Sequence, residues 1–435
     1  MTPHRLRRGA LHLPARRSRQ NATFIHLQAL SIEAEGDGME SLKDRAAIVG
    51  MGCTRFGERW DLGVEDLLVE AAFEAFEDAG IGPGDIQAAW MGTVSSGFSS
   101  IGLSPLGLQY IPMTRVENMC ATGTEALRAA TYAVLAGVCD IALAVGVEKL
   151  KDTAATGVKG PAIIGDNLEG TAGIGPGYSA PASFAHIATR YFHQYGLAPE
   201  EGRRLLAEIA VKNHHNGFLN PKAHFQNELT VEQAMKAPIV AWPLGLYDCC
   251  GVSDGAAVAV ITRGDMAKKF RPDPIYIKAL NVVCGARQGT MRQDYDFTHV
   301  EENILASRQA YKEAGVKDAR KEISIAEVHD CFTIHELILY EDLGFSPRGG
   351  AREDINAGTY TLKGDLPVNT DGGLKCFGHP LGASGLRMMY EVYKQLQQKA
   401  GPRQVKNPRL GLTHNLGGNA GSGIGTCCIV GNEKG

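Results

Sequence analysis

The sequence contains no apolar run close to the ~20 residues that a membrane-spanning helix requires. Neither charge sign dominates, since a net charge of -4 leaves no strongly basic surface for nucleic acid or acidic lipid. None of the ten cysteines stands in a Cys-x-x-Cys pair, the spacing of zinc ribbons and redox motifs. We therefore expect free thiols in a reducing cytoplasm, with neither a membrane nor nucleic acid as partner.

The first 32 residues are basic and contain no acidic side chain. This composition resembles a transit peptide, but it also fits translation from a start codon upstream of Met39. We favour the second interpretation and treat residues 1–42 as a disordered or non-native N-terminal extension.

A helical pattern followed by a strand pattern occurs twice in the chain. The stretch 64–80 places apolar residues on one helical face, and 300–315 repeats this in similar register. The face of the first stretch carries Val64, Leu67, Leu68, Ala71, Ala75, Phe76 and Ala79. Strand candidates follow in DIQAAWMGTV and ISIAEVHDCF.

The later parts of the two halves also match. Helices rich in small residues begin near 120 and 379, and each is followed by an apolar strand and a closing strand, GAAVAVITR or IGTCCIVG. Such alternation predicts mostly parallel sheets covered by helices, in two units about a pseudo-twofold axis. The expected boundaries are 43–152 plus 245–270 for the first half, 153–244 for an inserted loop domain, and 271–435 for the second half.

Cys120 lies among small residues in RVENMCATGTEALRAA, directly before a predicted helix. The thiolate is the nucleophilic form of cysteine, and the unpaired N–H groups of a helix N-terminus favour it. A buried core cysteine is the alternative interpretation of this residue taken alone.

His329 and Cys331 stand in EVHDCFTIHELILYEDLGF, where a predicted strand ends and a helix begins. Parallel-sheet enzymes place reacting groups at this position. The alternatives are a structural hydrogen bond for His329 and a helix cap for Asp330.

Two glycine-rich loops complete the set. GLKCFGHPLGASG brackets His379 in either a rigid ligand-binding loop or a simple tight turn, and HNLGGNAGSGIG can present backbone N–H groups to an oxyanion. The second loop lacks the strand-then-helix context of a dinucleotide-binding fingerprint, and VGMGCTRFG after the first strand has the wrong glycine spacing. Two thiols and two imidazoles in corresponding loops suit nucleophilic acyl transfer.

At GGLKCFGHPLGASG, VHDCF and YDCCGVSDGAAVAV the sequence resembles the thiolase superfamily, from about residue 44 onward. Within it, the chain is similar to the sterol-carrier-protein and archaeal-type branch. The resemblance implies an α/β protein with the thiolase fold: two duplicated βαβαβ-type halves packed as a layered αβαβα sandwich, with an inserted loop domain. It also implies CoA-dependent cleavage of a 3-oxoacyl-CoA, or the reverse Claisen condensation. Coenzyme A would be a co-substrate, with no metal and no permanently bound cofactor.

The resemblance also implies residue roles. Cys120 would carry the acyl group as a thioester, and His379 would activate it. His329 would join His379 in an oxyanion hole for the enolate. The backbone N–H of Cys120, with one near Gly417, would form the other oxyanion hole.

The second thiol of the reaction is implied to be Cys331, acting as acid and base at the substrate carbon. Other thiolases carry a Cys-x-Gly near their end, where this chain has HNLG at 414–417. Cys376 is a rival for the role because it stands close to His379 in the sequence.

The branch further implies a homodimer or higher oligomer and a small partner subunit with a zinc ribbon and an OB-fold domain. A similarity to benzoylsuccinyl-CoA thiolase suggests an aryl substrate. Four aromatic side chains of the insertion could line a pocket for it, or they could form a small core of the insertion itself. They are Tyr178, Phe184, Tyr191 and Phe192. The competing functions are an acyl-CoA retro-aldolase, which dispenses with the cysteine nucleophile, and a non-catalytic acyl-CoA-binding scaffold. The presence of Cys120 argues against the aldolase. The scaffold is disfavoured by the full set of reacting residues, which are Cys120, His329, Cys331 and His379.

Overall fold

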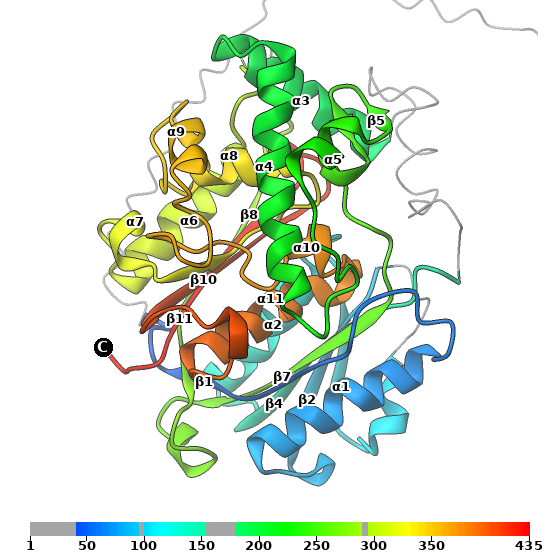
Figure 1. The fold of residues 1–435 in the computed structure, drawn as a ribbon. Helices are drawn as coiled ribbons and strands as arrows, with labels where there is room; N and C mark the ends of the chain where they lie inside the picture. Colours follow the sequence, from blue (N-terminus) through cyan, green and yellow to red (C-terminus); the bar gives the residue numbers. More distant parts are fainter. Residues whose placement is uncertain (1–40, 95–99, 153–178, 289–294) are drawn as a thin grey trace, which may run out of the picture. The chain divides into compact units, whose positions relative to one another are not determined.

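A computed structural model describes residues 41–94, 100–152, 179–288 and 295–435 (Figure 1). The expectation for residues 1–42 therefore lies outside the described residues, apart from its last two positions, and so does Tyr178. The α-helices are α1 (Val64–Ala79), α2 (Thr122–Leu135), α3 (Ala180–Gln194), α4 (Pro199–Phe218), α5 (Val231–Lys236), α6 (Glu301–Ala314), α7 (Ala319–Glu322), α8 (Thr333–Asp342), α9 (Ala351–Asn356), α10 (Gly373–Cys376) and α11 (Leu381–Leu396). The strands are β1 (Ala46–Cys53), β2 (Ala88–Gly92), β3 (Met113–Val116), β4 (Ile141–Glu148), β5 (Ile239–Ala241), β6 (Leu244–Gly245), β7 (Gly255–Arg263), β8 (Ile275–Cys284), β9 (Ile325–Glu327), β10 (Leu410–Gly417) and β11 (Ile424–Gly431).

The strands show the duplication directly. Nine of them form one sheet in the order β3-β2-β4-β7-β1-β8-β11-β10-β9, and β5 pairs with β6 separately. On either side of the β1/β8 junction the order mirrors itself, so that β2, β4, β7 and β1 correspond to β9, β10, β11 and β8. Few residues pair at this junction, since β1 and β8 pair only at Ala47 with Tyr276 and at Ile48 with Ile275. The sheet is therefore two half-sheets that meet at an edge.

Strand direction follows the connections. Pairing is parallel where helices connect the strands, as expected, between β2 and both β3 and β4, and between β9 and β10. The closing strands β7 and β11 instead run antiparallel to both of their neighbours, and β1 runs antiparallel to β8. An antiparallel neighbour needs no helical crossover, and β11 follows β10 after a short loop.

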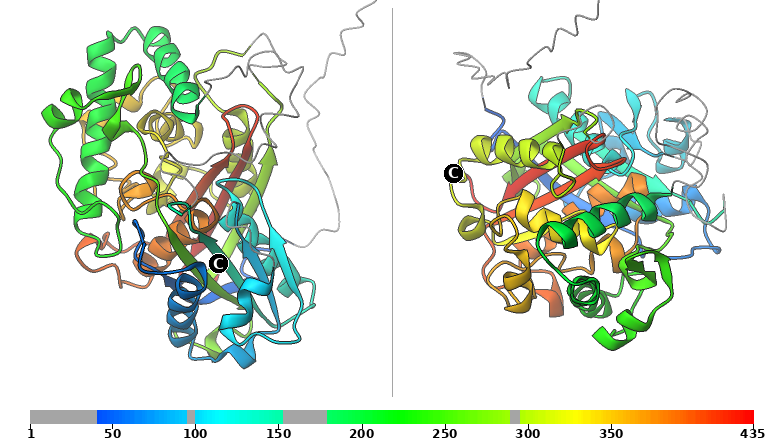
Figure 2. Two further views of the ribbon diagram at one scale, coloured as in Figure 1. Left: turned by 90° about the vertical axis from the view of Figure 1, so that its right-hand side faces the viewer. Right: turned by 90° about the horizontal axis from the view of Figure 1, so that it is seen from above.

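Helices cover the half-sheets in layers. α1 packs on β1 and β7, and α6 packs on β8 and β11. Between the half-sheets, α2 and α11 pack on each other, α2 against β4 and α11 against both β4 and β10. Every apolar position expected on the inner face of α1 is buried. The resulting order of layers is helix, sheet, helices, sheet, helix, which can be followed from the blue α1 to the yellow-green α6 (Figures 1 and 2).

The described part of the insertion, 179–244, contributes α3, α4, α5 and the β5–β6 pair, drawn in green (Figure 1). α3 and α4 pack on α8, and α4 also contacts α9 and α10. Within the described residues, none of the helices is long and apolar enough to cross a bilayer. The boundaries of the halves and of the insertion stay predictions.

Candidate active site

Cys120 and His379 occupy equivalent positions in the two halves. Each stands two residues before the start of a central helix, α2 for Cys120 and α11 for His379. In the first half, β3 leads into the cysteine loop beside β2. In the second half, an isolated parallel bridge between Ala326 of β9 and Val368 takes the place of β3. The duplication therefore brings the starts of two paired helices, and the residues before them, to one point.

Glycines allow these two helices to meet backbone to backbone. A Cβ on Gly123 would lie 2.9 Å from the carbonyl oxygen of Gly382, and one on Gly385 would lie 2.5 Å from the backbone nitrogen of Thr124. A side chain at either position would push α2 and α11 apart. The small residues in CATGT and GASG thus have a packing role as well as leaving room for a ligand.

The loop that carries Cys120 is tightly constrained. Met119 has a φ of 51°, a left-handed conformation that is unfavourable for a residue with a side chain. Thr122 stabilises the turn, because its Oγ1 donates to the Met119 carbonyl and accepts from the Asn118 N–H at 2.9 Å. A Cβ on Gly417, at the end of β10, would lie 2.1 Å from the Asn118 carbonyl oxygen. The end of β10 therefore lies directly against the cysteine loop.

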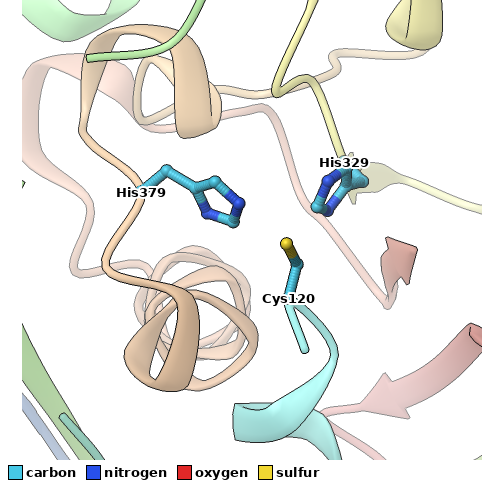
Figure 3. A group of neighbouring side chains, drawn as sticks. All are labelled: Cys120, His329 and His379. Atoms are coloured by element: carbon cyan, nitrogen blue, oxygen red, sulfur yellow. The ribbon is translucent and has the colours of Figure 1, made fainter. Parts of the chain in front are cut away.

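The structure brings Cys120, His329 and His379 together. The Cys120 sulfur and one ring nitrogen of each histidine all lie within 4.8 Å of one another. The two imidazole rings have centroids 5.2 Å apart, and the sulfur points into the space between them (Figure 3). Both histidines are buried, whereas Cys120 as a whole residue is partly exposed.

Ser384 sets the protonation pattern of His379. The serine hydroxyl lies 2.7 Å from Nδ1 of His379 and donates its single hydrogen to the Pro380 carbonyl at 2.9 Å. It therefore accepts from Nδ1–H, which leaves a lone pair on Nε2. Nε2 is buried and has no hydrogen-bond partner in the described part of the chain. His379 thus presents a free base to the cysteine.

Burial keeps all three groups neutral. It lowers the pKa of His379 to about 3, with a further contribution from the Arg387 guanidinium, and it lowers the pKa of His329 well below its usual value. Burial also raises the pKa of the Cys120 thiol to about 12, opposed by the backbone N–H groups of Gly418 and Cys120. The helix N-terminus was expected to favour the thiolate, but loss of water outweighs it here. The resting site is a neutral thiol beside neutral imidazoles.

The second expected thiol, Cys331, also lies next to His329. Its sulfur and ring nitrogens of His329 and His335 lie within 4.8 Å of one another, and burial raises its pKa well above the usual value. Cys376, the rival, is elsewhere: its thiol donates to the Phe225 carbonyl at 3.0 Å and packs against α4. Only Cys331 of the two is therefore placed to act with His329.

The loop that carries His329 and Cys331 is anchored on both sides of His329. The Val328 N–H donates to Asn369 Oδ1 at 2.8 Å, and the Asp330 carboxylate accepts from the Leu374 N–H at 2.6 Å. Asp330 is a helix cap, as one interpretation of the sequence held, but it caps α10 rather than the helix that follows it.

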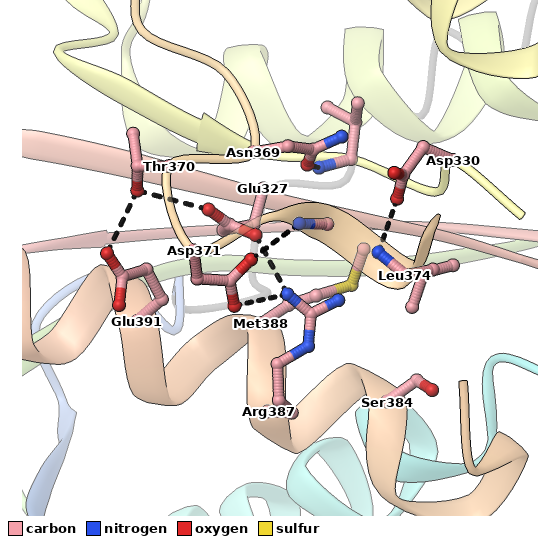
Figure 4. A network of polar contacts seen from close by, with 12 residues as sticks. Glu327, Asp330, Asn369, Thr370, Asp371, Leu374, Ser384, Arg387, Met388 and Glu391 are labelled. Atoms are coloured by element: carbon pink, nitrogen blue, oxygen red, sulfur yellow. Dashed lines mark hydrogen bonds and ion pairs between the residues drawn. The ribbon is translucent and has the colours of Figure 1, made fainter. Parts of the chain in front are cut away.

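A buried ionic network joins three segments next to the two histidines (Figure 4). Arg387 on α11 has no exposed surface, and it pairs with Glu327 at 3.0 Å and with Asp371. Thr370 donates to Glu327 at 3.2 Å and lies 3.0 Å from Glu391 of α11. The charge on Arg387 therefore ties β9, the loop before α10, and α11 together beneath the site.

Two family comparisons cover most of the chain. Residues 46–265 match "Thiolase, N-terminal domain" and residues 285–427 match "Thiolase C-terminal domain-like". The chain belongs to the thiolase family. The α/β fold class and the acyltransferase class expected from the resemblance are thereby confirmed.

The relatives place this thiolase in the expected branch. An acetyl-CoA acetyltransferase of Methanothermobacter thermautotrophicus is 38% identical over 383 residues, 86% of this chain and 97% of the relative. Sterol carrier protein 2 of Gallus gallus is 34% identical, over 88% of this chain and 72% of the relative. The benzoylsuccinyl-CoA thiolase subunit BbsB of Thauera aromatica is 32% identical, over 87% of this chain and 96% of the relative.

Among solved structures, the Ltp2-ChsH2(DUF35) aldolase superposes with a TM-score of 0.78 at 25% identity. The match covers 91% of this chain and all of that one. Both thiolase and aldolase chemistry therefore occur among proteins similar to this thiolase.

Several residues near the site could not be recognised from the sequence alone. Ser384 is marked only by its position five residues after His379, and the nearby N–H group belongs to Gly418, the neighbour of Gly417. Cys249 and Cys250 are both partly exposed, and the Cys250 N–H donates to the Cys331 carbonyl at 2.9 Å. The isolated bridge between Cys249 and Phe332 holds this segment against the Cys331 loop.

The aromatic residues of the insertion are part of the protein core. Phe184, Tyr191 and Phe192 all belong to one buried cluster, with the Tyr191 hydroxyl 2.5 Å from Glu341. Phe184 also packs on Phe332 and on His335, with ring centroids 4.7 and 5.3 Å apart. Of the three described residues, Phe184 is therefore the one whose ring contacts the segment that follows Cys331.

Proposed function

We propose that this protein is an acyl-CoA thiolase that cleaves a 3-oxoacyl-CoA with coenzyme A through an acyl group on Cys120, or runs the reverse condensation. The observation that carries the proposal is the free Nε2 of His379 beside the Cys120 sulfur. The identity to acetyl-CoA acetyltransferases supports the substrate class.

Attack on the substrate begins from the neutral pair. As the Cys120 sulfur bonds to the 3-oxo carbon, its proton passes to Nε2 of His379, because a free thiolate is unfavourable in this buried site. We assign stabilisation of the oxygen that becomes negative to the N–H groups of Cys120 and Gly418, and their effect of lowering the pKa of the Cys120 thiol supports this role.

Carbon–carbon cleavage then needs a place for the departing electron pair. The pair moves into the thioester as an enolate, whose oxygen accepts hydrogen bonds from His329 and from protonated His379. Cys331 donates a proton to the enolate carbon, which releases acetyl-CoA or its homologue. The thiol of coenzyme A then gives its proton to Cys331 and attacks the acyl group on Cys120. The Cys120 sulfur departs and takes its proton back from His379, so the shortened acyl-CoA is released and each group returns to its resting state.

The test is turnover with acetoacetyl-CoA and with an aryl 3-oxoacyl-CoA, each with coenzyme A, followed by loss of the 3-oxo chromophore. Cys120→Ala should reduce the rate by at least about 1000-fold, as loss of a covalent nucleophile does. Cys376→Ala removes a buried thiol outside the site and is the matched control, with turnover expected to persist. Faster turnover of the aryl compound would assign the aryl substrate class.

An aldolase is the second candidate, favoured by the structural match to Ltp2-ChsH2(DUF35). It predicts cleavage of a 3-hydroxyacyl-CoA that survives Cys120→Ala. That result, without thiolysis, contradicts the thiolase proposal.

We extend the proposal to assembly as a homodimer or larger, with a small partner subunit of the zinc-ribbon and OB-fold type. The DUF35 component named in the aldolase structure supports the partner. Light scattering of the purified chain gives its oligomeric state, and a monomer would contradict the first part.

A further inference from the structure

We propose that His335 is a positioning residue for the carbon–carbon step, because its ring holds His329 in place to bind the enolate. The role rests on the proposed function, in which His329 donates a hydrogen bond to the enolate oxygen. His335 lies in the first turn of α8 and has no exposed surface. One of its ring nitrogens lies within 4.8 Å of one of His329, and the two ring centroids are 5.4 Å apart at an angle of 70°.

Asn303 of α6 fixes which nitrogen of His335 carries the hydrogen. Its Nδ2 donates to the Asp342 carboxylate at 3.3 Å, and its Oδ1 lies 3.0 Å from Nε2 of His414. Arg348 pairs with Asp342 at 2.6 Å, which favours the ionised carboxylate. Because an ionised carboxylate only accepts, the amide nitrogen must face Asp342, and its other hydrogen is available to Nε2 of His335 at 3.4 Å. A neutral imidazole that accepts at Nε2 carries its hydrogen on Nδ1.

The Nδ1–H of His335 is directed at the main-chain carbonyl of His329. Burial lowers the pKa of His335 to about 3, so the ring is neutral, and the interaction with this carbonyl opposes the lowering, as a donated hydrogen does. Nδ1 has no other partner among the described residues, and no described backbone N–H donates to the His329 carbonyl. The two groups are therefore each other's best available partners.

This contact acts at the residue that carries the reacting ring. The Val328 N–H and the Asp330 carboxylate anchor the chain before and after His329, and the His335 contact adds a third hold at His329 itself. A donor stabilises an oxyanion only when it lies within hydrogen-bond distance of the charge, so a small displacement of His329 weakens the enolate step. The acyl transfer at Cys120 uses backbone N–H groups and His379 instead, and should be much less affected.

Asparagine and glutamine at position 335 separate the roles of the two ring nitrogens. Counted from the main chain, the amide nitrogen of asparagine reaches the place of Nδ1, whereas that of glutamine reaches the place of Nε2. His335→Asn therefore keeps a donor for the His329 carbonyl and gives up the contact with Asn303. His335→Gln keeps a polar group near Asn303 and gives up the donor to His329.

Two rates are compared in the full chain. Carbon–carbon cleavage is followed in a single turnover, with enzyme in excess over coenzyme A and over whichever 3-oxoacyl-CoA, acetoacetyl or aryl, the parent cleaves faster. Acyl transfer alone is followed by exchange of labelled coenzyme A into the shortened acyl-CoA, which needs Cys120 but no enolate. We expect His335→Gln to slow cleavage by about 10- to 100-fold while exchange stays near the parent rate. His335→Asn should keep both rates near those of the parent.

The matched control is His214→Gln. His214 on α4 is also a buried histidine, and its Nδ1 donates to the Asn227 carbonyl at 2.9 Å. Its replacement removes the same kind of hydrogen bond and should leave the ratio of cleavage to exchange at the parent value. Circular dichroism confirms that each variant is folded.

Equal slowing of cleavage and exchange in His335→Gln overturns the inference, because that is the result of a merely structural role. Equal cleavage rates in the asparagine and glutamine variants also overturn it. A parent protein that shows neither cleavage nor exchange contradicts the proposed function, and this role with it. The failure of the role alone is thus distinguishable, since it requires an active parent.

Discussion

Ser384→Ala tests whether the serine at the start of α11 prepares His379 as a base. The Pro380 carbonyl that loses the serine donor still accepts from the N–H groups of Ala383 and Ser384, so the Nδ1–H of His379 is the group left unpaired. Its loss costs about 1–3 kcal/mol and frees the ring to turn its N–H toward Cys120. At 1.36 kcal/mol per tenfold, kcat/KM for thiolysis should fall by about 5- to 150-fold.

The control for this variant is Ser307→Ala. Ser307 is also a buried helix serine, on α6, and its hydroxyl donates to the Ile304 carbonyl at 3.0 Å. It should lower the thermal midpoint to a similar extent while leaving kcat/KM at the parent value. The reasoning is refuted if Ser384→Ala keeps the parent kcat/KM, or if both variants slow the reaction equally.

Three further predictions concern packing, charge and pH. Gly385→Ala places a Cβ 2.5 Å from the Thr124 nitrogen, so we expect a loss of about 1–3 kcal/mol in unfolding free energy and slower thiolysis. The control is Gly84→Ala, which has open space around the added Cβ and should show neither effect in the same denaturation and rate assays. Arg387→Met leaves two buried carboxylates without their cation and should cost about 3–5 kcal/mol in chemical denaturation, so a parent-like midpoint contradicts it. Because His379 acts as a base in its neutral form, and its pKa is about 3, kcat/KM should show no loss as pH falls from about 8 to about 5; a limb near pH 6.5 would contradict this.

Local patterns in the sequence predicted the elements and the loops that carry the reacting groups. The inner face of α1 is a repeat over a few turns, and every expected residue on it is buried. Likewise, Cys120, His329 and His379 stand at strand ends and helix starts, where periodicity changes. The duplication then implied that such loops meet, which the mirrored strand order explains.

Properties that depend on distant neighbours were not predictable. The raised pKa of Cys120 comes from burial by parts of the chain hundreds of residues away, so a local helix argument predicted the opposite direction. The antiparallel closing strands leave no mark in the sequence of β7 or β11. Nothing near His335 in the chain reveals that its ring faces His329, because the contact depends on how α8 packs.

The account depends most on a covalent acyl group at Cys120, and mass spectrometry of the quenched reaction measures it directly. After incubation with a 3-oxoacyl-CoA and no free coenzyme A, we predict an added acyl mass on the peptide that contains Cys120, removed on addition of coenzyme A. Turnover without any acylated peptide, or with the acyl group on Cys331 or Cys250 instead, would contradict the account.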